Sequence, residues 1–168
     1  AGSSGQEIYS IFITLLDNFP QLKDWRLDLY STDLSQQIVD KGKKGIYESH
    51  EIQRGLEQDS LNKYFNAVDD KHWQVKLEYR TQVRFLPSNL KEDFRSHVPN
   101  VDFISCRNVL IYFDPDTKME IIKRLAKKVN QGGFLLLGQV DYINCKEPPA
   151  GFDYKLEGTF PYYFNAEE

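Results

Sequence analysis

The sequence is poor in the residues that build disulfide frameworks and metal centres. It holds two cysteines, Cys106 and Cys145, and three histidines among 168 residues. Two cysteines are too few for a disulfide framework, and their separation does not match the spacing of metal ligands. We therefore expect no metal site and a reducing, cytoplasmic environment.

Long apolar runs and an excess of basic charge are also missing. No stretch of about 18 apolar residues occurs, which excludes a transmembrane helix. The 21 Lys and Arg residues are outnumbered by 25 Asp and Glu residues, giving a formal charge of −4. This balance argues against a broad nucleic-acid-binding surface. The sequence opens with Ala1 rather than methionine, and we expect it to be a piece of a longer protein.

The composition is that of a folded globular domain. Hydrophobic residues make up 40% of the chain and charged residues 27%. A chain of this length corresponds to about one domain and buries roughly 70% of its unfolded surface. It can therefore form a core without disulfides or metals.

The N-terminal third indicates a loop, a helix, a strand and a second helix. The small residues 2–5 precede apolar positions at helical spacing from Ile8 to Leu16, with Pro20 beyond. Alternation over Trp25–Tyr30 predicts a strand that leads to Asp33. Residues 35–44 predict a helix broken by Gly42 and Gly45.

The middle of the chain interrupts this order. Residues 48–65 are polar and predict short helical pieces. Trp73–Glu78 and Thr81–Phe85 alternate in hydrophobicity, which predicts a hairpin. We interpret residues 45–88 as a small antiparallel insertion.

Regular α/β order returns in the C-terminal half. Val101–Cys106 is apolar enough for a strand buried on both faces. Asp114 followed by Pro115 is a strong helix start, and residues 130–133 (Asn-Gln-Gly-Gly) are expected to stop that helix. Phe134–Leu137 predicts another buried strand, and residues 153–164 predict a closing hairpin around Gly158.

Alternating helices and buried strands predict a parallel α/β sheet. Ligands of such sheets bind beyond the carboxyl ends of the strands. The residues that follow the predicted strands are therefore the candidates for a site. They are the loop 2–5, Asp33, Asn89, Leu90, Arg107, Asn108, Tyr112 and residues 138–141.

Three N-terminal features have two interpretations each. The Gly/Ser loop is either a plain tight turn or an expression scar, or a place where backbone N–H groups approach a ligand. Glu7 either complements the helix dipole or holds a ligand ammonium group. Asp33 either caps the next helix or accepts hydrogen bonds from ribose hydroxyls.

Three residues that follow the predicted strand Val101–Cys106 also have more than one interpretation. Arg107 and Asn108 follow the strand directly, where an arginine seldom serves packing, although a surface salt bridge is the alternative. Tyr112 lies in an apolar run and either packs into the core or offers its ring to a cationic ligand.

These residues also occur in the order of a known family. The chain resembles the S-adenosylmethionine-binding domain of the CheR family of chemotaxis receptor methyltransferases over nearly its whole length. The segment 106–114 (CRNVLIYFD) is highly specific for this resemblance. The other matching segments are residues 2–10 (GSSGQEIYS), 31–33 (STD), 45–47 (GIY), 63–65 (KYF) and 89–90 (NL).

The resemblance implies a Rossmann-like class I methyltransferase sheet with a small antiparallel insertion, in one domain over residues 1–168. It implies methyl transfer from S-adenosylmethionine to glutamate side chains on the signalling helices of chemotaxis receptors. It also implies site roles: Ala1 and Glu7 hold the methionine part, Asp33 binds the ribose, and Asn89 and Leu90 frame the adenosine. Arg107 and Asn108 line the site, Tyr112 lies near the sulfonium, and Arg107 and Tyr112 are the candidate catalytic residues.

Methyl transfer to a carboxylate explains why no His, Cys or Ser constellation stands out. A glutamate has a pKa of about 4.3 and is already an anion at neutral pH. The protein must supply positioning and the exclusion of water rather than a general base.

The chain departs from the family pattern in several places. Gln6 and Ile8 replace an acid and a proline, and residues 138–141 (Gly-Gln-Val-Asp) replace Gly-His-Ser-Glu. The family's N-terminal helical domain and its first, central strand are expected to be missing. The insertion lacks the glycine-containing extension of those relatives that dock a receptor C-terminal peptide, so we expect no such docking.

Two other functions compete with the glutamate methyltransferase. One is a non-catalytic S-adenosylmethionine-binding or interaction module of the same fold, favoured by Gln6 and Gln139. The other is a nicotinamide-dependent oxidoreductase, which is disfavoured because the loop lacks a complete G-x-G-x-x-G pattern. We expect neither nucleic-acid binding nor membrane insertion.

Overall fold

A computed structural model describes the chain except for residues 1, 53–55, 93–97, 143–147, 158–159 and 167–168. The described chain divides into two compact units, Gly2–Ser88 and Asn89–Glu168. No helix in these described parts combines the length and the apolar character needed to cross a membrane.

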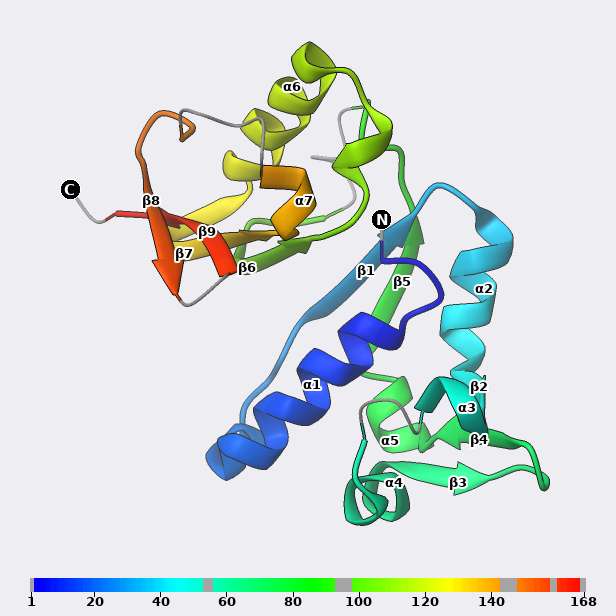
Figure 1. Cartoon of the computed structure of the whole chain (residues 1–168). Helices are drawn as coiled ribbons and strands as arrows, with labels where there is room; N and C mark the ends of the chain where they lie inside the picture. The colour runs from blue at the N-terminus through cyan, green and yellow to red at the C-terminus, as the bar shows by residue number, and fades with distance from the viewer. Residues whose placement is uncertain (1, 53–55, 93–97, 143–147, 158–159, 167–168) are drawn as a thin grey trace. The chain divides into compact units, whose positions relative to one another are not determined.

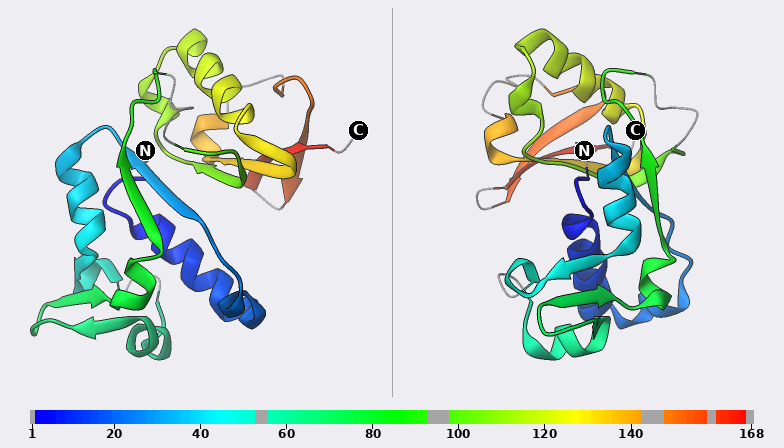
Figure 2. Two further views of the ribbon diagram at one scale, coloured as in Figure 1. Left: turned by 180° about the vertical axis from the view of Figure 1, so that it is seen from behind. Right: turned by 90° about the vertical axis from the view of Figure 1, so that its right-hand side faces the viewer.

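The first unit is built on a pair of parallel strands. Strand β1 (Leu29–Asp33) pairs in parallel with β5 (Val83–Pro87), so that Ser31 lies beside Phe85. Helix α1 (Gln6–Asn18) precedes β1 through a short 3-10 helix (Pro20–Asp24), and α2 (Gln36–Lys44) follows it. Figure 1 shows these elements in blue, cyan and green, and Figure 2 shows the two strands side by side from behind.

The predicted strand at Trp25–Tyr30 begins four residues too early. Trp25 is 64% exposed, and the strand starts at Leu29 and ends at Asp33. Residues 25–28 form an irregular connection in which Leu27 is half-buried against the core, so their hydrophobic alternation resembles that of a strand. The predicted acid at the end of the strand is confirmed.

The insertion forms a separate antiparallel sheet in the order β2–β4–β3, with β4 at its centre. The predicted boundary at residue 88 is wrong, because β5 (Val83–Pro87) belongs to the parallel pair with β1. Short helices flank these strands, as expected from the polar stretch. The elements are β2 (Ile46–Glu48), α3 (Ser49–Ile52), α4 (Gln58–Tyr64), β3 (Phe65–Ala67), β4 (His72–Val75) and α5 (Leu77–Arg80).

The predicted hairpin between residues 73–78 and 81–85 is wrong. Helix α5 (Leu77–Arg80) separates the two segments, β4 pairs within the insertion, and β5 pairs with β1. Both segments have strand-like alternation, but this pattern does not specify which partner each strand takes.

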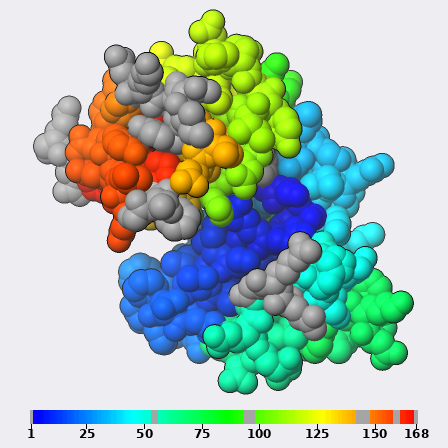
Figure 3. Space-filling view, in the orientation of Figure 1, coloured from blue at the N-terminus to red at the C-terminus, as the bar shows by residue number. Residues whose placement is uncertain are grey.

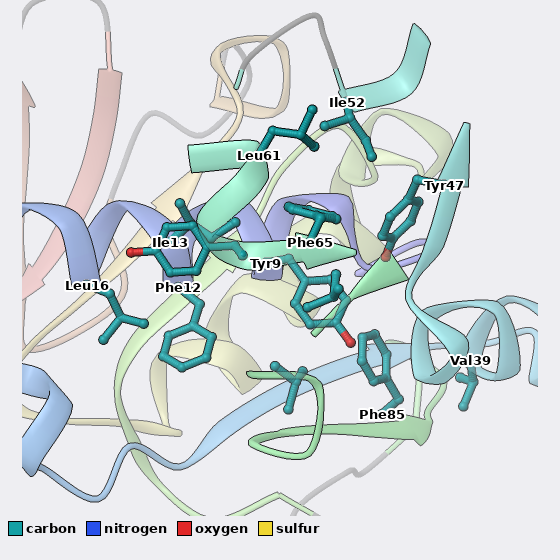
Figure 4. Close-up of a cluster of buried hydrophobic side chains, with 13 residues drawn as sticks. Tyr9, Phe12, Ile13, Leu16, Val39, Tyr47, Ile52, Leu61, Phe65 and Phe85 are labelled. Atoms are coloured by element: carbon teal, nitrogen blue, oxygen red, sulfur yellow. The ribbon is translucent and has the colours of Figure 1, made fainter. Parts of the chain in front are cut away.

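One apolar core joins the parallel pair, the helices and the insertion of this unit. Tyr9 and Phe12 from α1 are nearly inaccessible, and Tyr9 packs on Phe85 of β5 with ring centroids 5.8 Å apart. Tyr47 and Phe65 enter the same cluster from the insertion (Figure 4). In the space-filling view of Figure 3, α1 in dark blue lies against the teal residues of the insertion.

Helix α2 has the predicted bounds, but Gly42 does not break it. Ser35 caps its start, accepting a hydrogen bond from the Ile38 N–H at 3.4 Å. Gly45 ends it in the left-handed conformation at φ 59°. Gly42 lies inside the helix, where its missing side chain makes room for the Phe85 ring.

The second unit contains a four-stranded mixed sheet in the order β6–β7–β9–β8. The pair β6–β7 is parallel, and β9 runs antiparallel to both β7 and β8. The predicted closing hairpin is confirmed, although Gly158 itself lies outside the described residues. The elements are β6 (Val101–Cys106), a 3-10 helix (Leu110–Tyr112), α6 (Pro115–Ala126), β7 (Val129–Leu137), α7 (Gln139–Tyr142), β8 (Phe152–Glu157) and β9 (Phe160–Asn165).

Helix α6 begins as predicted, since the Asp114 carboxylate accepts a hydrogen bond from the Thr117 N–H at 3.0 Å. Its buried face, with Ile121 and Ile122 fully inaccessible, packs on β7 in a second core. The residues 130–133 do not stop the helix. They lie within β7, whose pairing with β6 shifts register at that point, with Gly132 at φ 74°.

Candidate functional site

The Gly/Ser loop is hydrogen-bonded to the carboxyl end of β1. The Gly2 N–H donates to the Thr32 carbonyl at 2.6 Å, and the Ser3 N–H donates to Asp33 Oδ2 at 3.1 Å. A Cβ on Gly2 would lie 2.0 Å from the Ser31 hydroxyl oxygen, so no side chain fits there. Gly5 then turns the chain into α1 at φ 95°. The loop is therefore a defined structure at the strand end, which is compatible with both the plain-turn and the ligand-approaching interpretation.

Asp33 organises the same strand end. Its Oδ2 accepts from Ser3 and its Oδ1 accepts from the Ser35 N–H at 3.2 Å. Ser35, rather than Asp33, is the N-cap of α2, so the capping interpretation of Asp33 is wrong. A carboxylate has about four acceptor positions, and the two backbone bonds leave others. The half-buried Asp33 can thus accept hydrogen bonds from vicinal hydroxyls of a ligand.

Glu7 lies in the first turn of α1, beside the N-cap Gly5, which offers no capping side chain. The carboxylate complements the positive end of the helix dipole. It is half-buried and lies in the same unit as the loop and Asp33. Both interpretations of Glu7 are compatible with this position.

A polar network that sequence reasoning missed connects the loop to the insertion. The Ser4 hydroxyl donates to the Gln6 side-chain carbonyl at 2.7 Å, and the Gln6 amide donates to Glu51 Oε1 at 3.1 Å. The backbone N–H of Glu48 donates to Glu51 at 2.9 Å and is the main cause that lowers the Glu51 pKa. An acid at position 6 would repel Glu51, whereas the amide of Gln6 binds it.

A small cavity lies beside this network. It measures about 80 Å³ and is lined by Gln6 and Glu51 together with apolar residues of α1 and the insertion. Pockets for drug-sized ligands measure about 300–1,000 Å³, and neither Glu7 nor Asp33 lines this cavity. It is therefore not a pocket for a nucleoside-sized cofactor.

In the second unit, Arg107 and Asn108 follow β6 directly and are exposed. Asn108 adopts a left-handed conformation at φ 58°. Tyr112 ends the 3-10 helix with its side chain 78% exposed. Its core-packing interpretation is therefore wrong, and its ring is accessible to a ligand.

Asn89 and Leu90 form a turn fixed to α6. Asn89 Oδ1 accepts from the Lys91 N–H at 3.0 Å, which is a local turn-forming bond. The Arg124 guanidinium donates to the Leu90 carbonyl at 3.2 Å, and the Leu90 side chain packs on the second core. The turn is thereby held at a constant position relative to α6.

The candidate residues are divided between the two units. Glu7 and Asp33 lie in the unit Gly2–Ser88, and Ala1 lies outside the described residues. Within the described residues, no group of three or more His, Cys, Asp or Glu side chains could hold a metal ion. The second unit holds the other candidates: Asn89, Leu90, Arg107, Asn108 and Tyr112.

Sequence comparison identifies relatives over most of the chain. Residues 1–152 match the family model described as CheR methyltransferase, SAM binding domain. The chain is 38% identical over 141 residues to a chemotaxis protein methyltransferase of Vibrio anguillarum, covering 82% of this chain and 50% of that protein. It is 38% identical over 148 residues to the Pseudomonas putida chemotaxis protein methyltransferase Cher2, covering 86% and 53%. The chain thus spans about half the length of these curated relatives.

The fold agrees with this relationship. The solved structure of human N-acetylserotonin methyltransferase in complex with SAM matches with a TM-score of 0.52 and 13% sequence identity. The match covers 99% of this chain and 46% of that one. The mixed α/β architecture is accordingly that of the class I methyltransferases, as the sequence resemblance implied. The match over residues 1–152 and the 38% identity to curated relatives together show that this chain belongs to the CheR methyltransferase family.

Proposed function

We propose that residues 1–168 act as the S-adenosylmethionine-binding domain of a methyltransferase that forms methyl esters on glutamate side chains of chemotaxis receptors. Membership of the CheR family supports the reaction. The observation that carries the cofactor assignment is the loop Gly2–Gly5 held against Asp33 at the carboxyl end of β1. Because receptor signalling helices are cytoplasmic, the proposal places the reaction in the cytoplasm.

The residues of the chain fit parts of this cofactor. Asp33 keeps acceptor capacity for the ribose hydroxyls, and Gly2 and Ser3 bring backbone close to the same point. Glu7, with Ala1, is proposed to bind the methionine ammonium group, and Asn89 and Leu90 to frame the adenosine. Arg107 and Asn108 are proposed to line the site, with the exposed Tyr112 ring beside the sulfonium.

When bound, S-adenosylmethionine supplies a methyl group attached to a good leaving group. The receptor glutamate, ionised at neutral pH, provides the attacking oxygen. An oxygen–methyl bond forms as the sulfur–methyl bond breaks, converting a carboxylate and a sulfonium into a neutral ester and a thioether. The chain needs no general base, so its residues act by aligning oxygen, carbon and sulfur and by excluding water. Arg107 and Tyr112 are the proposed residues nearest this centre.

The cofactor assignment is tested by calorimetry of S-adenosylhomocysteine with the full-length protein. Asp33→Ala is expected to weaken binding about tenfold or more, corresponding to about 1.4 kcal/mol. Asp40→Ala is the matched control, because it removes an exposed carboxylate from α2 in the same unit.

An analogue of S-adenosylhomocysteine without the ribose 2′- and 3′-hydroxyls shows why Asp33→Ala weakens binding. It distinguishes the loss of a direct contact between Asp33 and the ribose from a disruption of the loop Gly2–Gly5. The wild type should bind this analogue more weakly than S-adenosylhomocysteine, whereas Asp33→Ala should bind both equally. An unchanged affinity of Asp33→Ala for S-adenosylhomocysteine would show that the ribose assignment is wrong. Binding without methyl transfer to receptors would favour the non-catalytic module.

A further inference from the structure

A fully buried carboxylate lies next to the segment that follows β6. Asp141, in the short helix α7, is 0% exposed. Its Oδ1 accepts a hydrogen bond from the Ile111 N–H at 3.1 Å, and its Oδ2 accepts one from the Asn108 N–H. Figure 1 shows α7, in orange, beside the yellow-green chain that contains these two residues. One side chain thus binds two backbone groups that lie 30 and 33 residues away.

The segment bound by Asp141 contains a residue in the left-handed conformation. Asn108 is one of two described non-glycine residues with positive φ, at 58°. Asparagine tolerates this conformation better than most residues other than glycine, but a left-handed residue still needs support from surrounding structure. A carboxyl group offers two oxygens, and here each accepts a hydrogen bond from a backbone N–H of the segment. The carboxylate therefore supplies that support on both sides of Val109.

The backbone at Gly138 lies close to the contact between Asp141 and Asn108. A Cβ on Gly138 would lie 2.5 Å from Asp141 Oδ2 and 3.0 Å from the Asn108 nitrogen. Any side chain at position 138 would therefore displace the carboxylate or the Asn108 backbone. On the other side, fully buried Leu110 anchors the segment in the second core. Arg107 and Tyr112 remain exposed at the two ends of the anchored segment.

We propose that Asp141 is a positioning residue that fixes the segment Arg107–Tyr112 in the geometry in which it meets the cofactor. The inference rests on the proposed function, because the roles of Arg107, Asn108 and Tyr112 belong to it. Asp141 itself is fully buried and acts through the backbone of Asn108 and Ile111. It does not touch the reacting atoms.

The two hydrogen bonds that Asp141 accepts determine which substitution tests the contact. A carboxylate accepts at both oxygens, whereas an amide of the same shape has only one acceptor and turns an N–H₂ toward the other donor. Asp141→Asn therefore preserves volume but loses one of the two bonds. Asp153→Asn is the matched control, because it removes the same charge from an exposed site on β8 of the same unit.

The first measurement is made on the full-length wild-type protein by nuclear magnetic resonance. The amide protons of Asn108 and Ile111 are expected to resonate downfield and to exchange slowly with solvent, although their segment is largely exposed. In Asp141→Asn at least one of the two resonances should move upfield, and in Asp153→Asn neither should move. Rapid exchange of both amides in the wild type would overturn the contact without reliance on any variant.

The second measurement is calorimetry of S-adenosylhomocysteine with the same three proteins. Asp141→Asn is expected to bind about tenfold more weakly, corresponding to about 1.4 kcal/mol, and Asp153→Asn to bind as the wild type does. If Asp141→Asn shows the resonance change but retains wild-type affinity, the positioning role is wrong while the proposed function stands. If the wild type does not bind S-adenosylhomocysteine, the proposed function fails and the positioning role fails with it.

Discussion

Gly42 shows how a single missing side chain fixes the packing of the first unit. Its backbone lies against the Phe85 ring, and an added Cβ would be 2.3 Å from Cε1 and 2.6 Å from Cδ1 of that ring. The ring is buried and contacts Tyr9 from α1, which limits its freedom to move aside. At position 42, α2 thus meets β5 through the Phe85 ring and α1 through the Tyr9 hydroxyl, which donates to the Gly42 carbonyl at 3.1 Å.

Gly42→Ala is expected to destabilise the protein despite the helical position. Alanine gains about 1 kcal/mol over glycine in a helix interior, whereas overpacking costs about 1–3 kcal/mol. With a contact as short as 2.3 Å we expect the packing cost to dominate, giving a net loss of about 1–2 kcal/mol in unfolding free energy. Urea denaturation measures this change in unfolding free energy, and Gln37→Ala on the exposed face of α2 is the control. A gain in stability would contradict the packing.

Tyr112 allows a test of charge recognition at the proposed sulfonium position. Its side chain is 78% exposed, so truncation should leave the unfolding free energy unchanged. A ring beside a cation contributes about 0.5–2 kcal/mol. Tyr112→Ala should therefore weaken binding of positively charged S-adenosylmethionine but hardly affect neutral S-adenosylhomocysteine. Tyr154→Ala, on β8, is the control. Equal weakening of both ligands would refute the placement of the ring near the sulfur.

The candidate residues differ in how far sequence could reveal them. The positions of Asp33, Arg107 and Asn108 at or just after the carboxyl ends of β1 and β6 were predictable from the sequence, and their roles in ligand binding stay a prediction. The partners of Ser3 and Gln6 were not, because Asp33 and Glu51 lie 30 and 45 residues away along the chain. Hydrogen bonds over such separations depend on the tertiary fold, which no local pattern records.

The side-chain hydrogen bonds between helices α1 and α4 converge on one carboxylate. Asp17 near the end of α1 accepts hydrogen bonds from the Tyr64 hydroxyl at 2.7 Å, from the Ser60 hydroxyl at 3.3 Å and from the Lys63 ammonium group. The Lys63 bond is the main cause that lowers the Asp17 pKa from 3.8. These hydrogen bonds, unlike the apolar packing of α4 in the same core, therefore depend on the ionised form of Asp17.

This linkage predicts a pH dependence. Because the folded-state pKa lies below the unfolded value, the contribution to stability is present above the unfolded pKa and disappears as pH falls through the folded one. Asp17→Asn should cost about 1 kcal/mol at pH 7, since partial exposure weakens the charged bond. The two stability curves should converge in acid below the pKa of 3.8.

Denaturation between pH 2 and pH 7 tests this expectation, with exposed Asp24→Asn as the control. A constant difference between wild type and Asp17→Asn across that range would contradict the role assigned to the carboxylate.

Elements with a local signal were predicted well, and strand partners were not. The Asp114–Pro115 start of α6 agrees with the structure because helix capping is determined by adjacent residues. The apolar run Val101–Cys106 does form β6, but only Cys106 in it is buried, so the predicted burial on both faces is wrong. The segments that became β4 and β5 both alternate, but they belong to different sheets. Pairing is decided by which faces the helices cover, and this information is spread over the whole unit.

At the scale of the molecule, two cores support the two units. One contains Tyr9, Phe12 and Phe85, and the other contains Leu110, Ile121 and Leu135. The family match over residues 1–152 extends across both units. The proposed cofactor residues are also divided between them, so the proposed activity requires the whole chain rather than either unit alone.

The central claim is that the protein transfers methyl groups to receptor glutamates. Its most direct test is incubation of the full-length protein with chemoreceptor and methyl-labelled S-adenosylmethionine. The account predicts label on the receptor that mild alkali releases as methanol, as from a carboxylate ester, and greatly reduced label with Asp33→Ala. A protein that binds S-adenosylmethionine but leaves the receptor unlabelled, or adds a label that alkali does not release, would contradict it.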